Sequence, residues 1–232
     1  MKKTTQDTVG VNMARRSFLR YAGVGVAATT GVLAMASCRK HHDDIDLGGS
    51  TAIDVGSGDF GILNYAYALE QLEAAFYIQV AAHPYTGMSS DEQALLTGIR
   101  DHEVGHREFF KAALGTHAIV SLTTDGMARY GSSRTKVLSA AQAFEDTGVS
   151  AYNGAAYLIK DATYLTLAGK IVSVEARHAS YIRNLVSYGS FADNTILDTN
   201  GMDKQKTIAQ VLTIANTYLK TKVSASAYNY IP

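Results

Sequence analysis

The sequence predicts an all-α fold: a four-helix bundle with a long crossover between its second and third helices and a short helix near the C-terminus. Apolar residues recur every three to four positions through four segments, which is the period of a helix with one buried face. Each segment has about 24 residues, or about 36 Å as a helix, which is the scale of a bundle. The segment that separates the second from the third is long, as expected for a crossover.

The helix boundaries follow from capping and breaking residues. Ser89 and Glu92 have the spacing of a capping box at the start of the second helix, and Asp161 can cap the fourth. The crossover 116–132 contains a β-prone run over 118–122. The predicted helices are 60–82, 89–114, 132–160, 161–188 and 203–220.

Composition excludes several classes of protein. The 232 residues are 47% hydrophobic, which is enough to form a packed core and excludes a disordered chain. Basic and acidic residues number 21 each, so nothing indicates a nucleic-acid surface. A single cysteine excludes a disulfide framework, a cysteine-rich zinc site and a rubredoxin-type iron site.

The N-terminus has the pattern of an export signal. Arg15 and Arg16, followed by Phe-Leu, resemble a twin-arginine signal, and the apolar run 21–36 after them is too short to span a bilayer. Residues 35–38 resemble a lipobox, in which Cys38 would be lipidated; an incidental cysteine near the end of a signal is the alternative. We expect an exported protein that a lipid on Cys38 anchors to a membrane of the bacterial envelope.

This interpretation divides the chain into four parts. We expect a signal peptide over 1–37, a flexible tether over 38–57 that lacks any periodicity, the helical bundle with its C-terminal helix over 58–222, and a tail over 223–232.

Two Glu-x-x-His motifs carry the chemistry of the predicted bundle. Glu103 and His106 lie in the second predicted helix, and Glu175 and His178 in the fourth. Residues three apart project from one face of a helix, so each pair can share a metal ion. With seven glutamates and seven histidines in the chain, chance predicts about 0.2 such motifs, so two are informative.

A weak internal repeat adds one glutamate from each remaining helix. Alignment of 63–77 with 138–152 places Glu70 on Glu145 and Tyr77 on Tyr152, at an offset of 75 residues. The two Glu-x-x-His motifs are 72 residues apart. Four inward glutamates and two histidines form the ligand set of a carboxylate-bridged dimetal site. Such a site suits two divalent ions, and we expect iron in preference to manganese.

The repeat also ranks the neighbouring candidates. Glu73 could be a further ligand, but its counterpart is Gly148, which argues for a supporting position. His102 lies near the face of His106, but its counterpart is Val174, so a surface or supporting role is favoured. For Tyr77 and Tyr152, core packing with a bonded hydroxyl is favoured over redox activity. A bundle that buries its carboxylates without metal is disfavoured, because the charges would lack compensation.

Several segments of the sequence resemble the ferritin-like superfamily, and within it the exported bacterial ferritin-like group that includes desiccation-related proteins. The resemblance covers 59–218 and is carried by residues 64–77, 101–110, 144–148 and 175–178. It implies a ferritin-like bundle and a set of metal ligands. These are Glu70, Glu103, His106, Glu145, Glu175 and His178.

Two functions remain open from the sequence. In the first, the protein is a redox metalloprotein that reacts with dioxygen or peroxide and takes electrons from an external reductant, with Glu103 and Glu175 bridging the metals. Glu70 and Glu145 would then be terminal ligands.

In the second function, the chain is a non-enzymatic envelope protein with a stress or structural role, whose metal site stabilises the bundle. An anchored iron-storage cage fits poorly with a lipid on every chain, and the oligomeric state is not predicted.

Overall fold

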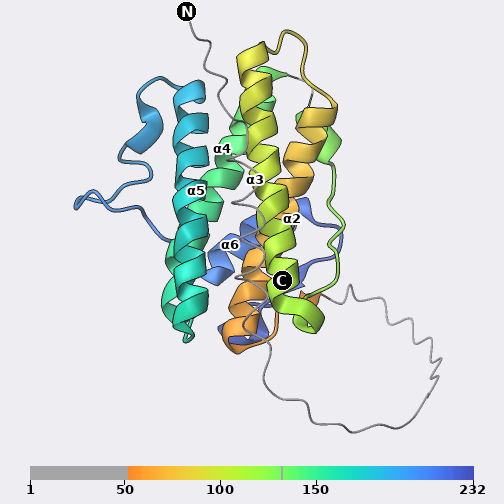
Figure 1. Ribbon diagram of the computed structural model, residues 1–232, viewed down its shortest axis with the longest axis vertical. Coiled ribbons are helices and arrows are strands. Elements are labelled where there is room, and N and C mark those ends of the chain that lie inside the picture. Colours follow the sequence, from red (N-terminus) through yellow and green to blue (C-terminus); the bar gives the residue numbers. More distant parts are fainter. Residues whose placement is uncertain (1–51, 132) are drawn as a thin grey trace, which may run out of the picture. The chain divides into compact units, whose positions relative to one another are not determined.

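Four long helices form the bundle that the sequence predicts. The computed structural model describes residues 52–131 and 133–232, so the predicted signal, Cys38 and most of the predicted tether lie outside the described residues. Helix α2 packs against α3 and helix α4 against α5, and the two pairs meet mainly through α2 and α4 (Figure 1). The bounds are α2 Gly58–Ala82, α3 Ser90–Leu114, α4 Arg134–Ala155 and α5 Ala162–Val186.

The crossover between α3 and α4 runs along the length of the bundle, so that α3 and α4 start at the same end (Figure 1). Two buried amides of α2 hold it. Asn64 donates to the carbonyl of His117 at 2.8 Å and accepts from the backbone of Ile119 at 2.9 Å. Gln71 accepts from the backbone of Leu122 at 2.7 Å. No strand forms over the β-prone run 118–122. The side chains of Asn64 and Gln71 bind backbone amides of this run that a neighbouring strand would otherwise bind.

Capping residues fix where the helices begin. Ser89 accepts from the backbone of Glu92 at 3.1 Å, but the Glu92 carboxylate binds Arg134 at 2.7 Å, so only half of the predicted capping box forms. Asp161 caps α5 as predicted. Helix α4 ends at Ala155 rather than near 160, because Asp59 accepts from the backbone amides of residues 160 and 161 and holds this turn against the start of α2.

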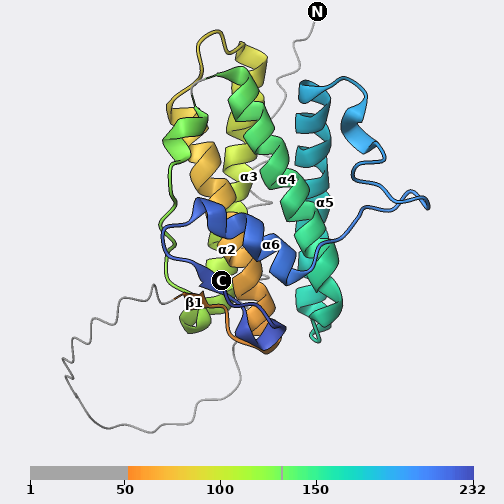
Figure 2. The same cartoon turned by 180° about the vertical axis from the view of Figure 1, so that it is seen from behind.

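The C-terminal region contains a shorter helix than the sequence predicts, and it forms regular structure where the sequence predicts a tail. Helix α6, Ile208–Ala215, begins at a complete capping box and lies across α2 and α4 (Figure 2). Strand β2, Val223–Ser224, pairs in parallel with β1, Ile53–Asp54. Parts of the predicted tether and tail therefore form structure against the bundle, because backbone pairing joins residues that are 170 positions apart. None of the helices among the described residues is long and apolar enough to cross a membrane.

Glycine at position 154 allows α4 to meet the chain that leads into α6. A Cβ on Gly154 would lie 1.8 Å from the carbonyl oxygen of Lys206, whose backbone amide donates to the carbonyl of Ser150. The backbone cannot withdraw from this contact without breaking that bond. The close approach therefore excludes any side chain here.

We expect Gly154→Ala to lower the free energy of unfolding by about 1–3 kcal/mol, the usual cost of overpacking. Gly169→Ala is the matched control, because Gly169 is exposed on α5 and a Cβ there would meet no other part of the protein within 4 Å. It should stabilise the protein by about 0.5–1 kcal/mol through helix propensity. Denaturant midpoints of both variants measure the difference; equal midpoints would contradict the close packing of α6 on α4.

Candidate metal centre

Six side chains from four helices meet in the middle of the bundle. The two Glu-x-x-His motifs lie on α3 and α5, and α2 and α4 contribute one glutamate each. The four glutamates are 0% exposed, and His178 is 5% exposed. The residues that the structure brings together are all six that the sequence selects: Glu70, Glu103, His106, Glu145, Glu175 and His178.

The six side chains form two overlapping groups. Within each group, ligand atoms lie within 4.8 Å of one another. Glu103 and Glu175 belong to both groups; Glu70 and His106 complete one, and Glu145 and His178 complete the other. Nδ1 of His106 lies 2.7 Å from Oε1 of Glu175, and Nδ1 of His178 lies 2.9 Å from Oε1 of Glu103. Each group could hold one metal ion.

Two tyrosines hold the glutamates that belong to a single group. The hydroxyl of Tyr77 on α2 donates to Oε1 of Glu145 on α4 at 2.5 Å. The hydroxyl of Tyr152 on α4 donates to Oε1 of Glu70 on α2 at 2.5 Å. The repeat thus appears in space as a reciprocal pair of bonds. The spacing of seven residues between each glutamate and tyrosine indicates a shared face, but not that each bond crosses to the opposite helix.

The remaining donor atoms fit a pair of cations. In the described part of the chain, eleven buried side-chain nitrogen and oxygen atoms lack a hydrogen-bond partner, and eight of them belong to the six residues. Apart from ion-pair contacts with the two histidines of the cluster, both oxygens of Glu103 and Glu175 lack a hydrogen bond, whereas Glu70 and Glu145 each have one such oxygen. Buried polar atoms are rarely left without partners. Carboxylate and imidazole donors that converge in this way suit iron or manganese.

Burial and close charges shift the pKa values within the cluster. Burial raises the pKa of Glu103 to about 8 and that of Glu145 to about 7. Burial would also raise the pKa of Glu175, but contacts with both histidines outweigh it and lower the pKa to about 2. Burial would lower the pKa of His106 and His178, but the surrounding carboxylates raise each to about 12. A cation that binds here must therefore replace protons.

His102 distinguishes the two groups. Its Nδ1 lies 2.8 Å from Nε2 of His178, and the two rings stack. If Nδ1 of His178 binds a metal, its Nε2 carries the proton and donates to His102, which fixes the tautomer and the ring. His106 has no such partner among the described residues. The supporting role that the sequence favours for His102 agrees with this contact.

Glu73 is buried beside the cluster but belongs to neither group. Its Oε1 would lie 2.8 Å from a Cβ at Gly148, so the glycine in the repeat leaves room for this carboxylate. Burial, and then the charge of Glu103, raises the pKa of Glu73 well above its ordinary value. The carboxyl is therefore best accommodated in its protonated form.

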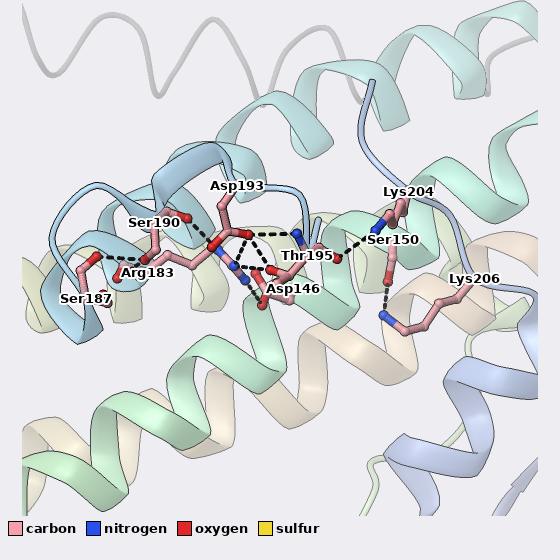
Figure 3. A network of polar contacts seen from close by, with 9 residues as sticks. All are labelled: Asp146, Ser150, Arg183, Ser187, Ser190, Asp193, Thr195, Lys204 and Lys206. Atoms are coloured by element: carbon pink, nitrogen blue, oxygen red, sulfur yellow. Dashed lines mark hydrogen bonds and ion pairs between the residues drawn. The ribbon is translucent and has the colours of Figure 1, made fainter. Parts of the chain in front are cut away.

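A large cavity lies outside this cluster. Its volume is about 730 Å³, and α4, α5 and the loop after α5 line it without any of the six residues. Arg183 ties that loop to the bundle: it contacts Asp146 at 2.6 Å, Asp193 at 2.9 Å and also Thr195 (Figure 3). Because Asp146 follows Glu145 directly, this clamp steadies the outer side of α4 at the level of the cluster. Nothing in the sequence pattern indicates it.

We expect His102→Ala to weaken binding of one of two metal ions by about 10- to 100-fold, the usual effect of losing the partner of a metal-bound histidine. Competition titration with Co²⁺, followed by its absorption spectrum, separates the two affinities. His83→Ala is the control, because His83 is exposed in a turn. Unchanged affinities in His102→Ala would show that this contact does not support His178.

Comparison with known proteins agrees with the geometry of the cluster. The family model of the ferritin-like domain matches residues 58–188, which contain α2 to α5 and all six residues of the cluster. No curated protein matches the chain. Since the match spans more than half of the chain, the protein belongs to the ferritin-like domain family.

Proposed function

We propose that the protein binds two iron or manganese ions at the cluster and reacts there with dioxygen or peroxide. The observation that carries this proposal is the convergence of eight donor atoms, from six buried or partly buried side chains, that make no hydrogen bond outside the cluster. Without cations, four buried carboxylates would have to share protons and two charged imidazoles, which is costly in a helical core.

The contacts suggest a role for each residue. No residue outside the cluster binds an oxygen of Glu103 or Glu175, and both residues belong to both groups, so they would bridge the two ions. Glu70 and Glu145 have one oxygen fixed by a tyrosine, which leaves one for a terminal bond. Nδ1 of His106 and of His178 would each bind one ion, because these atoms face the carboxylates.

The side chains of the cluster would hold the metals in place, and none of them would act as a nucleophile. Redox metals provide open coordination positions and electrons, which no side chain in the cluster can offer. The tyrosine hydroxyls hold the terminal carboxylates, and burial keeps bulk water away from the cluster. Burial raises the pKa of Tyr77 and Tyr152 well above the ordinary value, so both remain protonated donors. Since the single cysteine precludes a rubredoxin-type centre, electrons would come from an external reductant.

The metal content of the protein, expressed from the full chain and purified without chelator, tests this proposal. We expect about two iron or manganese ions per chain, and a clear loss of metal in Glu103→Gln and Glu175→Gln, because each replacement removes a charge shared by both groups. Glu108→Gln is the control on the same helix, since Glu108 is exposed. A wild-type protein free of iron and manganese, with both variants equally stable, would contradict the proposal.

Turnover separates the enzyme from the alternative, a non-enzymatic envelope protein in which metal only stabilises the bundle. Metal-dependent consumption of dioxygen or peroxide supports the redox function. A raised melting temperature with metal, without such consumption, supports the stabilising role.

We also propose that the chain is exported and anchored through Cys38. The support is the order of the N-terminal features: two arginines, a short apolar run and the single cysteine. Mass spectrometry of the mature protein checks this. We expect Cys38 as a lipidated N-terminus and release from the membrane fraction in Cys38→Ser; an intact N-terminus before residue 38 would contradict it.

A further inference from the structure

A small apolar pocket lies inside the bundle next to the cluster, at the end where α2 begins. Its volume is about 20 Å³, which exceeds the roughly 10–15 Å³ that one water-sized molecule needs. The first half of α2 and the last turns of α4 form most of its wall. One wall residue is Tyr152, which is bonded to Glu70, and another is Leu69, the neighbour of Glu70. The pocket therefore reaches the side chains that hold the cluster.

The wall also reaches the outside of the bundle. Ala156 and Ile159 belong to it, and both are only partly buried in the turn between α4 and α5. The pocket thus spans from a partly exposed turn to the residues around Glu70.

The internal repeat shows that this space is specific to one end of the bundle. Three alanines of the wall, Ala151, Ala155 and Ala168, have larger residues at the equivalent positions of the other half. At the offsets of 75 and 72 residues these equivalents are Phe76, Val80 and Leu96. All three are at most 1% exposed and belong to the packed core. Equivalent positions of the repeat therefore carry large side chains at one end of the bundle and alanine at the other.

The chemistry of the wall selects its occupant. Apolar atoms supply nearly all of the surface, and the hydroxyl of Tyr152 already donates to Glu70. Hydrogen peroxide would lose its hydrogen bonds to water on entering, without replacing them, whereas dioxygen has none to lose. An organic substrate larger than a few atoms exceeds the volume.

We propose that this pocket binds dioxygen and leads it to the metal centre, so that dioxygen rather than peroxide is the oxidant. The role of the pocket in the reaction rests on the proposed function, because it requires a metal centre that reacts with dioxygen. The pocket itself, and what binds in it, can be tested without any metal.

Xenon is the probe for the first test, because it binds apolar cavities of this kind. We expect crystals of the metal-free protein under xenon pressure to show xenon between Ala151, Ala155 and Ala168. Ala168→Leu, which copies Leu96, should abolish that peak; Ala155→Val, which copies Val80, is the milder variant if the first folds poorly. No xenon in the wild-type pocket would overturn the inference, whatever the metal content.

The second test uses the ferrous-loaded protein. We expect Ala168→Leu to slow oxidation by dioxygen several-fold, with metal content and the rate of oxidation by hydrogen peroxide unchanged. Ala112→Leu, at an exposed position of α3, is the control for adding a leucine. Equal slowing of both oxidants, or of neither, would overturn the role in dioxygen entry. If the protein holds neither iron nor manganese, the proposed function fails, while the xenon result still decides whether the pocket binds small apolar molecules.

Discussion

Four buried carboxylates in the centre of a helical bundle are the constraint on which the rest of the structure depends. Each would lose its hydration on folding, so each needs a partner that is fixed in place. Two tyrosine hydroxyls each bind one oxygen of Glu145 or Glu70, and the other oxygens converge with two imidazole nitrogens in two groups. This arrangement accounts for the length of the four helices, because each carries a glutamate near its middle with apolar residues on both sides.

The convergence of the six residues was predictable because their spacing is local. A Glu-x-x-His motif places both side chains on one helical face whatever the surrounding fold, and the repeat supplied the choice of Glu70 over Glu73. The structure adds a steric account of that choice, since Gly148 makes room for the Glu73 carboxylate. Helix starts at Ser89 and Asp161 were predictable for the same reason, because caps are short-range features.

Contacts between distant segments were not predictable from pattern. The pairing of β1 with β2 joins two-residue strands near opposite ends of the bundle sequence, and no alternation of apolar residues marks so short a strand. Asn64 and Gln71 look like polar interruptions of an apolar helix, yet they hold the crossover. The clamp on Arg183 also depends on a loop whose path only the folded chain defines.

The two halves of the bundle share the residues of the cluster and differ around them. Glu73 faces Gly148, and His102 supports His178 where the other half has Val174. Phe76 stands at the position equivalent to Ala151 and is packed in the core, whereas Ala151 lines a pocket. Each difference lies in contact with the cluster or its supporting tyrosines. The two groups of donor atoms are therefore unequal in support, since His102 contacts only His178, and the apolar pocket lies at one end of the bundle.

Anomalous diffraction from crystals of the protein as purified, collected across the iron and manganese absorption edges, tests the central claim most directly. The account predicts two peaks: one among Glu70, Glu103, His106 and Glu175, and one among Glu103, Glu145, Glu175 and His178. A cluster without any peak in a well-ordered protein that had been offered both metals would contradict it.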